Sequence, residues 1–272
     1  MGVLNVTPDS FSDGGRYAGV EAARDHALAL IGQGADIIDI GGESTRPGAP
    51  RVDVQEEMAR VLPVLDALQD VLASGTVAIS IDTSQPLLMR AALDRGASII
   101  NDVRSFSLPG ALAAVQDRDC GLVIMHMQGE PGTMQQQPRY ADVVAEVRDW
   151  LGRRRDALLE AGVAAGRIAL DPGFGFGKAH GHNRELLAGL APLAGLGHAL
   201  LVGLSRKATL GDITGRPVGQ RDAASLAAAL IAVQKGARIV RVHDVAATRD
   251  ALAVWEAVQA SGPRGAVEGE AA

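Results

Sequence analysis

The chain has 272 residues, of which 47% are hydrophobic and 21% are charged, a mixture typical of a folded protein and not of a disordered one. Its net charge of −6 argues against nucleic acid as the main partner, which would normally require a basic excess. No apolar stretch approaches the roughly 20 residues of a membrane helix, and the N-terminus lacks a signal-peptide pattern, so we predict a soluble, cytoplasmic protein.

Short apolar runs alternate with longer amphipathic stretches along the chain. The runs, each predicted to be a strand, are residues 3–6, 35–40, 77–81, 98–103, 122–127, 168–170, 199–204 and 238–242. The clearest predicted helices cover residues 20–33, 54–71, 141–161 and 223–235. Strands this apolar are typical of a parallel sheet covered on both faces. Eightfold alternation predicts a single (β/α)8 TIM barrel, with an open doubly wound sheet as the alternative.

The barrel is expected to occupy residues 1–260, and the small, polar tail 261–272 is expected to be disordered. Because the first strand begins almost at Met1, the N-terminal floor of the barrel must be covered in some other way, unless the chain is truncated. Glycine is favoured where a helix ends in the left-handed conformation, so four glycines before strands are predicted to end helices. These are Gly34, Gly96, Gly121 and Gly236. The single cysteine, Cys120, precedes an apolar run and is expected in the core.

Every predicted strand carries a polar or ionisable group near its C-terminal end. In chain order these are Asn5, Asp39, Asp82, Asn101 with Asp102, His126, Asp171, Ser205 with Arg206 and Lys207, and Arg241 with His243. Barrel enzymes build their active sites at this end of the strands. The pattern therefore predicts an active site there.

Some of these residues have a purely structural interpretation. Asp82 and Ser84 could cap a helix beginning near Pro86, since proline is common in a first helical turn. Asp102 could point outward and pair with Arg104. His126 could be a core histidine. The remaining histidines before His243 are interpreted as surface groups, namely His26, His180, His182 and His198.

Arg241 and His243 are two residues apart on a strand and so share a face. Burying an arginine is costly unless an anion or a carboxylate meets it, so this pair suggests an anion site. The glycine-rich stretch 173–178, GFGFGK, fits neither a phosphate-binding P-loop nor a dinucleotide fingerprint. We interpret it as a loop at the mouth of the barrel.

Across nearly its whole length the chain resembles the dihydropteroate synthases. GVLNVTPDSFSDGG and DIIDIGGESTRPGA resemble the two signatures of that family. They are followed in the family's order by IDTSQP, IINDVRS, VIMHMQGEPGTMQ, LDPGFGFGK, LVGLSRKATLG and RIVRVHDV. The resemblance implies a TIM barrel that condenses 6-hydroxymethyl-7,8-dihydropterin pyrophosphate with p-aminobenzoate, giving 7,8-dihydropteroate and pyrophosphate.

The resemblance also assigns roles to residues at matching positions. The pterin would be held by Asp82, Asn101, Asp171 and Lys207. The pyrophosphate would meet Asn5, Thr45, Arg46, Arg241 and His243, with Mg²⁺ between Asn5 and the phosphates. Two mobile loops, Thr7–Gly15 and Gly42–Gly48, would close over the pyrophosphate. The p-aminobenzoate pocket, which sulfonamides should also occupy, would contain Phe11, Thr45, Pro47, Phe176 and Ser205.

The implied reaction is loss of pyrophosphate to give a cation at the pterin methylene, followed by attack of the aryl amine. Arg241 and His243 would stabilise the leaving group, and Asp82 and Lys207 would complete the catalytic set. For Arg206 a structural role is as plausible as a role in the site. The family is expected to be homodimeric.

Two positions depart from the family, Ala179 where asparagine is common and Ala208 where serine is common. Two other functions stay open at this stage. A pterin-dependent methyltransferase would share the barrel but should not need the TRPG and SRK loops. A non-catalytic pterin-binding paralogue should have lost Arg241, His243 or loop residues that this chain retains.

Overall fold

The computed structural model describes residues 1–7, 15–43, 52–130 and 132–261, and its eight strands form one parallel sheet in chain order. The strands are β1 (Gly2–Asn5), β2 (Ile37–Gly41), β3 (Ala78–Asp82), β4 (Ile99–Asp102), β5 (Gly121–Met125), β6 (Ile168–Asp171), β7 (Ala199–Val202) and β8 (Ile239–Val240). Each lies within or beside a predicted apolar run.

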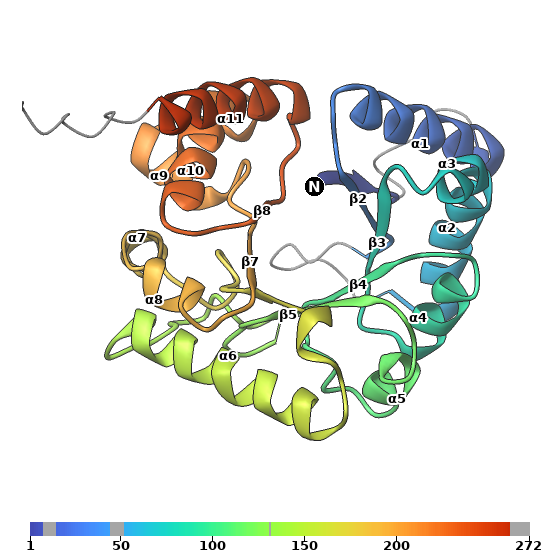
Figure 1. Cartoon of the computed structure of the whole chain (residues 1–272), viewed down its shortest axis with the longest axis horizontal. Coiled ribbons are helices and arrows are strands. Elements are labelled where there is room, and N and C mark those ends of the chain that lie inside the picture. The colour runs from blue at the N-terminus through green and yellow to red at the C-terminus, as the bar shows by residue number, and fades with distance from the viewer. Residues whose placement is uncertain (8–14, 44–51, 131, 262–272) are drawn as a thin grey trace, which may run out of the picture.

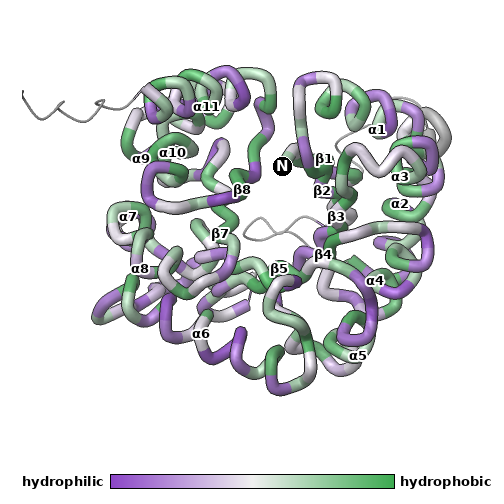
Figure 2. The backbone as a smooth tube through the Cα atoms, in the orientation of Figure 1, coloured by the Kyte–Doolittle hydropathy of each residue, from purple (hydrophilic) through white to green (hydrophobic). Residues whose placement is uncertain are grey.

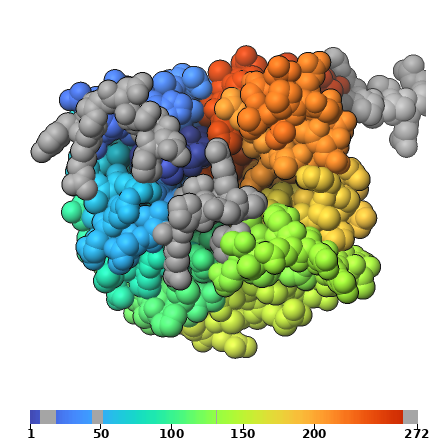
Figure 3. All heavy atoms as spheres, turned by 180° about the vertical axis from the view of Figure 1, so that it is seen from behind, coloured from blue at the N-terminus to red at the C-terminus, as the bar shows by residue number. Residues whose placement is uncertain are grey.

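The sheet closes on itself at the junction of its first and last strands. Gly2 forms a parallel bridge with Val242 just beyond β8. The Val3 N–H donates to the Val242 carbonyl at 3.1 Å, and the Val242 N–H donates to the Met1 carbonyl at 2.9 Å. The structure is therefore the predicted barrel, and the open doubly wound alternative is wrong. Figure 3 shows the same closure from outside, because residues of the first helix (blue) lie beside those of the last (red).

Helices surround the strands, as Figure 1 shows. They are α1 (Gly15–Gly32), α2 (Val54–Ala67), α3 (Gln69–Ser74), α4 (Pro86–Leu93), α5 (Ala111–Val115), α6 (Val143–Glu160), α7 (His180–Ala188), α8 (Ala191–Ala194), α9 (Ala208–Thr214), α10 (Asp222–Gln234) and α11 (Val245–Ala260), with short 3₁₀ turns at Ala165–Arg167 and Val218–Gln220. None of the helices among the described residues has the length and apolar character that crossing a membrane requires. Of the tail 261–272, predicted to be disordered, all but the first residue lies outside the described residues.

Local sequence explains where several helices begin and end. Asp53, Asp142 and Asp244 each accept a hydrogen bond from a backbone N–H in the first turn of the following helix, as N-cap residues do. The predicted helix 54–71 is two helices in the structure, because Leu68 leaves the helical conformation (φ −104°, ψ 15°) and its N–H bonds to the Leu65 carbonyl.

Three of the four predicted helix-ending glycines are confirmed. Gly34, Gly96 and Gly236 have φ of +93°, +96° and +103°. The prediction for Gly121 is wrong, because Gly121 is the first residue of β5 and pairs with Ile99. The helix before it has already ended at Val115, and a turn lies between them.

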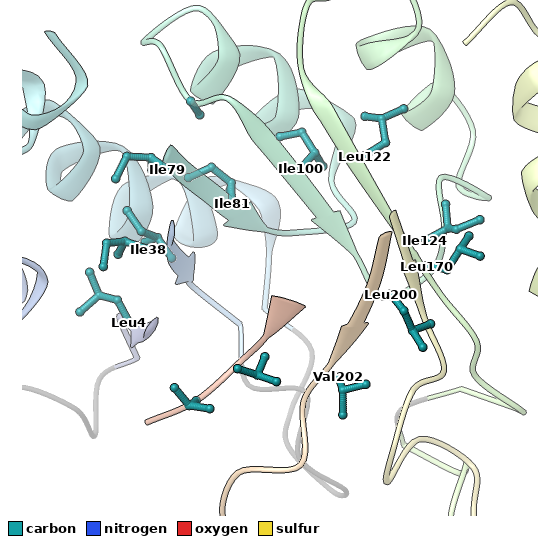
Figure 4. Close-up of a cluster of buried hydrophobic side chains, with 14 of the residues drawn as sticks. Leu4, Ile38, Ile79, Ile81, Ile100, Leu122, Ile124, Leu170, Leu200 and Val202 are labelled. Atoms are coloured by element: carbon teal, nitrogen blue, oxygen red, sulfur yellow. The ribbon is translucent and has the colours of Figure 1, made fainter. Parts of the chain in front are cut away.

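The strands bury apolar side chains on both faces. Outward-facing residues such as Ile38, Ile81 and Leu122 are buried in one large cluster with the helices, as Figure 4 shows. Hydrophobic stretches also recur around the ring of helices in Figure 2. Cys120 is buried in this cluster, which confirms its predicted place in the core.

A smaller cluster fills the N-terminal half of the barrel interior. Its buried members are Met1, Val123 and Leu201, with Ile37, Ile99, Ala169 and Ile239 packed against them. This layer is the floor on which the polar residues of the next layer rest.

Candidate active site

Polar side chains from neighbouring strands meet above the apolar floor. Asp39 pairs with Ser80 across β2 and β3, and Asp82 pairs with Asn101 across β3 and β4. Because side chains alternate between the faces of a strand, Asp39, Ser80, Asp82 and Asn101 all point into the barrel. Asp39 is fully buried and accepts hydrogen bonds from Ser80 Oγ at 2.6 Å and from Asn101 Nδ2 at 3.2 Å.

Arg241, the residue after β8, enters the same layer. Its Nε donates to Asp39 Oδ2 at 2.6 Å, and its Nη2 donates to Asp82 Oδ2 at 3.1 Å. The sequence left open whether an anion or a carboxylate would meet a buried arginine at this position, and the structure shows two carboxylates. Since a guanidinium has five N–H donors, two bonds leave donors for an anion.

Burial changes the protonation of the two carboxyls predicted to hold the pterin. Burial, together with the neighbouring Asp39, raises the pKa of Asp82 to about 7, although Arg241 acts in the opposite direction. Burial likewise raises the pKa of Asp171 to about 6, while the Gly173 N–H, which donates to its Oδ1 at 2.7 Å, and nearby lysines limit the rise. Perturbed carboxyls grouped at the end of barrel strands are typical of a functional site.

The residues after β7 join the predicted p-aminobenzoate pocket to the predicted pyrophosphate and pterin pockets. Ser205 Oγ lies 2.9 Å from His243 Nδ1 and accepts the His243 backbone N–H at 3.2 Å. The ammonium group of Lys207 lies 4.4 Å from the ring centroid of Phe176, a cation–π contact. The structure thus brings Ser205 together with His243, and Lys207 together with Phe176.

Phe176 belongs to a loop that is fixed from beneath by a buried lysine. Lys178 Nζ donates to the carbonyls of Gly173 at 2.9 Å and Phe176 at 3.1 Å, and to His126 Nδ1 at 2.8 Å. Burial, with the charge of Lys178 adding to it, lowers the pKa of His126 to about 3, so the imidazole is neutral and can accept. His126 is therefore a core histidine with a partner, and the stretch 173–178 is a loop at the barrel mouth, as predicted.

The other structural interpretations have mixed outcomes. The helix-capping role for Asp82 and Ser84 is wrong, because Gln85 is the N-cap of α4 and Ser84 Oγ donates to Asp102 instead. Asp102 points away from the interior and accepts the backbone N–H groups of Arg104 at 2.8 Å and Phe106 at 2.6 Å.

For Arg206 the structural role is supported. Its φ of 60° places it in the left-handed region. Its backbone N–H donates to Ser225 Oγ at 2.9 Å, and its side chain pairs with Asp222 at 3.1 Å. These contacts hold the turn that carries Ser205 and Lys207.

The two departures from the family lie at helix starts. Ala179 is the N-cap of α7, where a methyl group cannot accept a backbone hydrogen bond, and Ala208 is the first residue of α9. Without a side-chain cap at position 179, the free energy of unfolding is lower by about 1 kcal/mol. Neither departure removes a residue assigned to the site.

Asn5 ends β1 and pairs with Gly41 of β2, which in turn pairs with Asp82 of β3. A Cβ placed on Gly41 would lie 3.8 Å from Asp82 Oδ2 and 3.9 Å from Asn5 Oδ1, so both side chains lie over the space that this glycine leaves open. Among the described residues no group of three or more histidine, cysteine, aspartate or glutamate side chains could hold a metal. Phe11, Thr45, Arg46 and Pro47, and most of the two predicted mobile loops, lie outside the described residues.

Sequence reasoning missed two members of the site and one buried acid. The sequence places Asp39 near the end of a strand without indicating a specific role, and it places Lys178 at the end of a glycine-rich loop. Glu57 of α2 is 1% exposed, and neither of its carboxylate oxygens makes a well-formed hydrogen bond within the described residues, although the nearby Thr83 acts to lower its pKa. Burial raises its pKa to about 7. A charged residue inside an apolar run was the one available signal for Asp39.

Comparison with known proteins agrees with this geometry. The family described as pterin binding enzyme matches residues 1–243, so the chain belongs to the pterin-binding enzymes. It is 49% identical to the dihydropteroate synthase of Escherichia coli (strain K12) over 94% of this chain and 90% of that protein.

Two solved structures are close in both sequence and shape. The dihydropteroate synthase of Yersinia pestis, in complex with a sulfonamide drug, has a TM-score of 0.89 at 45% identity, covering 96% of this chain and 94% of the other. That of Xanthomonas albilineans, with 4-aminobenzoic acid, has a TM-score of 0.89 at 53% identity, covering 96% and 92%. The chain therefore belongs to the dihydropteroate synthases, a family of transferases, which confirms the resemblance found in the sequence.

Proposed function

We propose that the chain condenses 6-hydroxymethyl-7,8-dihydropterin pyrophosphate with p-aminobenzoate, releasing pyrophosphate and forming 7,8-dihydropteroate. The observation that carries the proposal is the layer of Asp39, Asp82, Asn101 and Arg241 at the C-terminal ends of the barrel strands. A buried layer with both carboxylates and a guanidinium can hold a ring rich in N–H donors beside an anionic leaving group.

The pterin is assigned to the described residues that present acceptors in the interior. Asp82, Asn101 and Asp171 would accept from its amino group and ring N–H, and Lys207 would donate to it. Because these acceptors are buried, a ligand without matching donors would leave them unpaired at a cost of about 1–3 kcal/mol each. This cost would make the pocket selective for the pterin edge.

The pyrophosphate is assigned to Asn5, Arg241 and His243, with Thr45 and Arg46 beyond the described residues. Arg241 and His243 would stabilise the charge that develops as the leaving group departs, which is the term that most lowers such a barrier. The nearby carboxylates of Asp82 and Asp171 would favour the cation that forms at the pterin methylene. No covalent enzyme intermediate is required.

Mg²⁺ is part of the proposal, held by the Asn5 carboxamide oxygen and the phosphates. The donors present fit this ion, because Mg²⁺ prefers hard oxygen ligands, is commonly bound by few protein groups and keeps several waters. When bound it would supply additional positive charge to the leaving group.

The aryl amine is assigned to the mouth of the barrel beside Phe176 and Ser205, with Phe11, Thr45 and Pro47. Ser205 would hold the carboxylate, and its contact with His243 would link the amine pocket to the pyrophosphate pocket. Sulfonamides, which share the aniline group, would compete for this place. A homodimer in the cytoplasm completes the proposal.

Complementation tests the proposal against its rivals. A bacterial strain lacking dihydropteroate synthase would be given this chain, or the Arg241→Ala variant, and grown without folate end products. We expect the strain to grow with the wild-type chain and not with the Arg241→Ala variant. If both chains are present in the soluble fraction at equal amounts and neither supports growth, a non-catalytic paralogue or a methyltransferase would be favoured instead.

A further inference from the structure

Asp39 of β2 contacts residues of two other strands and one residue just beyond a third. Its Oδ1 accepts from Ser80 Oγ on β3 at 2.6 Å. Its Oδ2 accepts both Asn101 Nδ2 on β4 at 3.2 Å and Arg241 Nε beyond β8 at 2.6 Å. Asp39 has no exposed surface, so it lies behind the residues that line the pocket.

These contacts fix which end of the Asn101 amide faces the ligand. A carboxylate has only acceptors, so the NH₂ end of Asn101 must point at Asp39. The carbonyl end is then directed away from Asp39. Within the described residues the Asn101 side chain makes this one hydrogen bond, so it is the contact that sets the orientation of the amide.

The same carboxylate oxygen also fixes Arg241. Because Oδ2 accepts from both groups, the amide on β4 and the guanidinium beyond β8 are held at a set separation although they are 140 residues apart in the chain. An ionised acceptor in a buried site makes stronger hydrogen bonds than a neutral one. A change at Asp39 therefore alters both groups while touching no ligand.

We propose that Asp39 is a positioning residue that sets the polarity of the Asn101 amide, so that Asn101 offers a carbonyl acceptor and not an amide donor to the pterin. The inference rests on the proposed function, because it assumes that Asn101 contacts the pterin. It assigns part of the selectivity for a ring N–H donor to a residue that the ligand never touches.

A double-mutant cycle on ligand binding tests this. The probe is 6-hydroxymethyl-7,8-dihydropterin, which keeps the ring N–H groups of the substrate but lacks the pyrophosphate, and so reports on the pterin pocket without Arg241's leaving-group role. Calorimetry would give its Kd for the wild type, Asp39→Ala, Asn101→Ala and the double variant. We expect each single change to weaken binding about tenfold, since each costs roughly one hydrogen bond to a buried group.

If Asp39 acts through Asn101, the double variant should bind within about twofold of Asn101→Ala alone, because coupled positions are not additive. Asp39→Asn should rescue binding to within about threefold of the wild type, because its carbonyl can occupy the Oδ2 position. Ser80→Ala is the matched control, since it removes only the Oδ1 contact, and should weaken binding less than threefold. Circular dichroism would confirm that each variant is folded.

Losses that multiply to about a hundredfold in the double variant would overturn the inference, as would a failure of Asp39→Asn to restore binding in a folded protein. A wild-type chain that bound no pterin would instead overturn the proposed function, and the inference with it. The two failures are thus distinguishable by the wild-type measurement.

Discussion

Gly173 supports the loop that carries Phe176, and replacing it by alanine should be among the most damaging small changes in the chain. Its φ is +69°, and a Cβ there would overlap the carbonyl oxygen of His126 and lie 3.0 Å from its carbonyl carbon. The left-handed conformation alone costs alanine about 1–2 kcal/mol. To relieve the overlap, the His126 peptide must move.

That movement would break two hydrogen bonds. The His126 N–H donates to the Asp171 carbonyl at 2.9 Å, and Lys178 Nζ donates to the His126 carbonyl at 3.3 Å. A neutral bond contributes about 1 kcal/mol and one to a charged group about 2 kcal/mol. Together with the backbone term, Gly173→Ala should therefore lower the free energy of unfolding by about 4–5 kcal/mol.

Gly162 provides the matched control. It follows α6 with φ of +89°, and nothing lies within 4 Å of the position that its Cβ would take. Gly162→Ala should therefore cost only the backbone term of about 1–2 kcal/mol. Urea titration followed by circular dichroism would measure both variants. Equal losses in the two variants would refute the reasoning that the His126 peptide forces glycine at position 173.

Four further predictions concern the site and its surroundings. Arg241→Ala should lower turnover about 10²-fold or more with less effect on p-aminobenzoate affinity, and a near-wild-type rate in steady-state assays would exclude its role with the leaving group. Between pH 4.5 and about pH 7 the wild type should lose up to about 3 kcal/mol of its free energy of unfolding, because the buried Glu57 carboxyl retains a proton that the unfolded chain has lost. Glu57→Gln should remove this loss, so the stability of the variant relative to the wild type should rise with pH. Denaturation across this range should show such a pH-dependent gain for Glu57→Gln and not for the control, Glu21→Gln at an exposed position. Sulfonamides should inhibit competitively with p-aminobenzoate, and inhibition that added p-aminobenzoate failed to relieve would place them elsewhere. Removal of Mg²⁺ with a chelator should abolish turnover and its return should restore it; turnover unaffected by the chelator would contradict the ion's role.

The fold was predictable because its signal is local and repeated. Each buried strand of a parallel barrel needs an apolar run, and each crossover needs an amphipathic helix, so the alternation can be read along the chain. Predictions about single residues failed where one residue type is common in two different local structures. Gly121 begins a strand although glycine before a strand usually ends a helix, and Ser84 bonds to Asp102 although serine before proline usually caps one.

The site was predictable in its members but not in its contacts. The residues at strand ends share one edge of the barrel, so Asp82, Asn101 and Arg241 could be grouped from sequence alone. The bonds among them depend on sheet register and barrel closure, which join residues far apart in sequence. Asp39 and Arg241 are such a pair, and the buried ammonium of Lys178 could not be distinguished from a solvated lysine by its neighbours in the chain.

We propose above all that this interior layer catalyses dihydropteroate formation. The most direct test mixes the purified chain with dihydropterin pyrophosphate, p-aminobenzoate and Mg²⁺, and follows dihydropteroate and pyrophosphate together by chromatography. The two products are expected to appear in equal amounts and over many turnovers. A folded sample that binds the pterin but forms neither product would contradict the proposal.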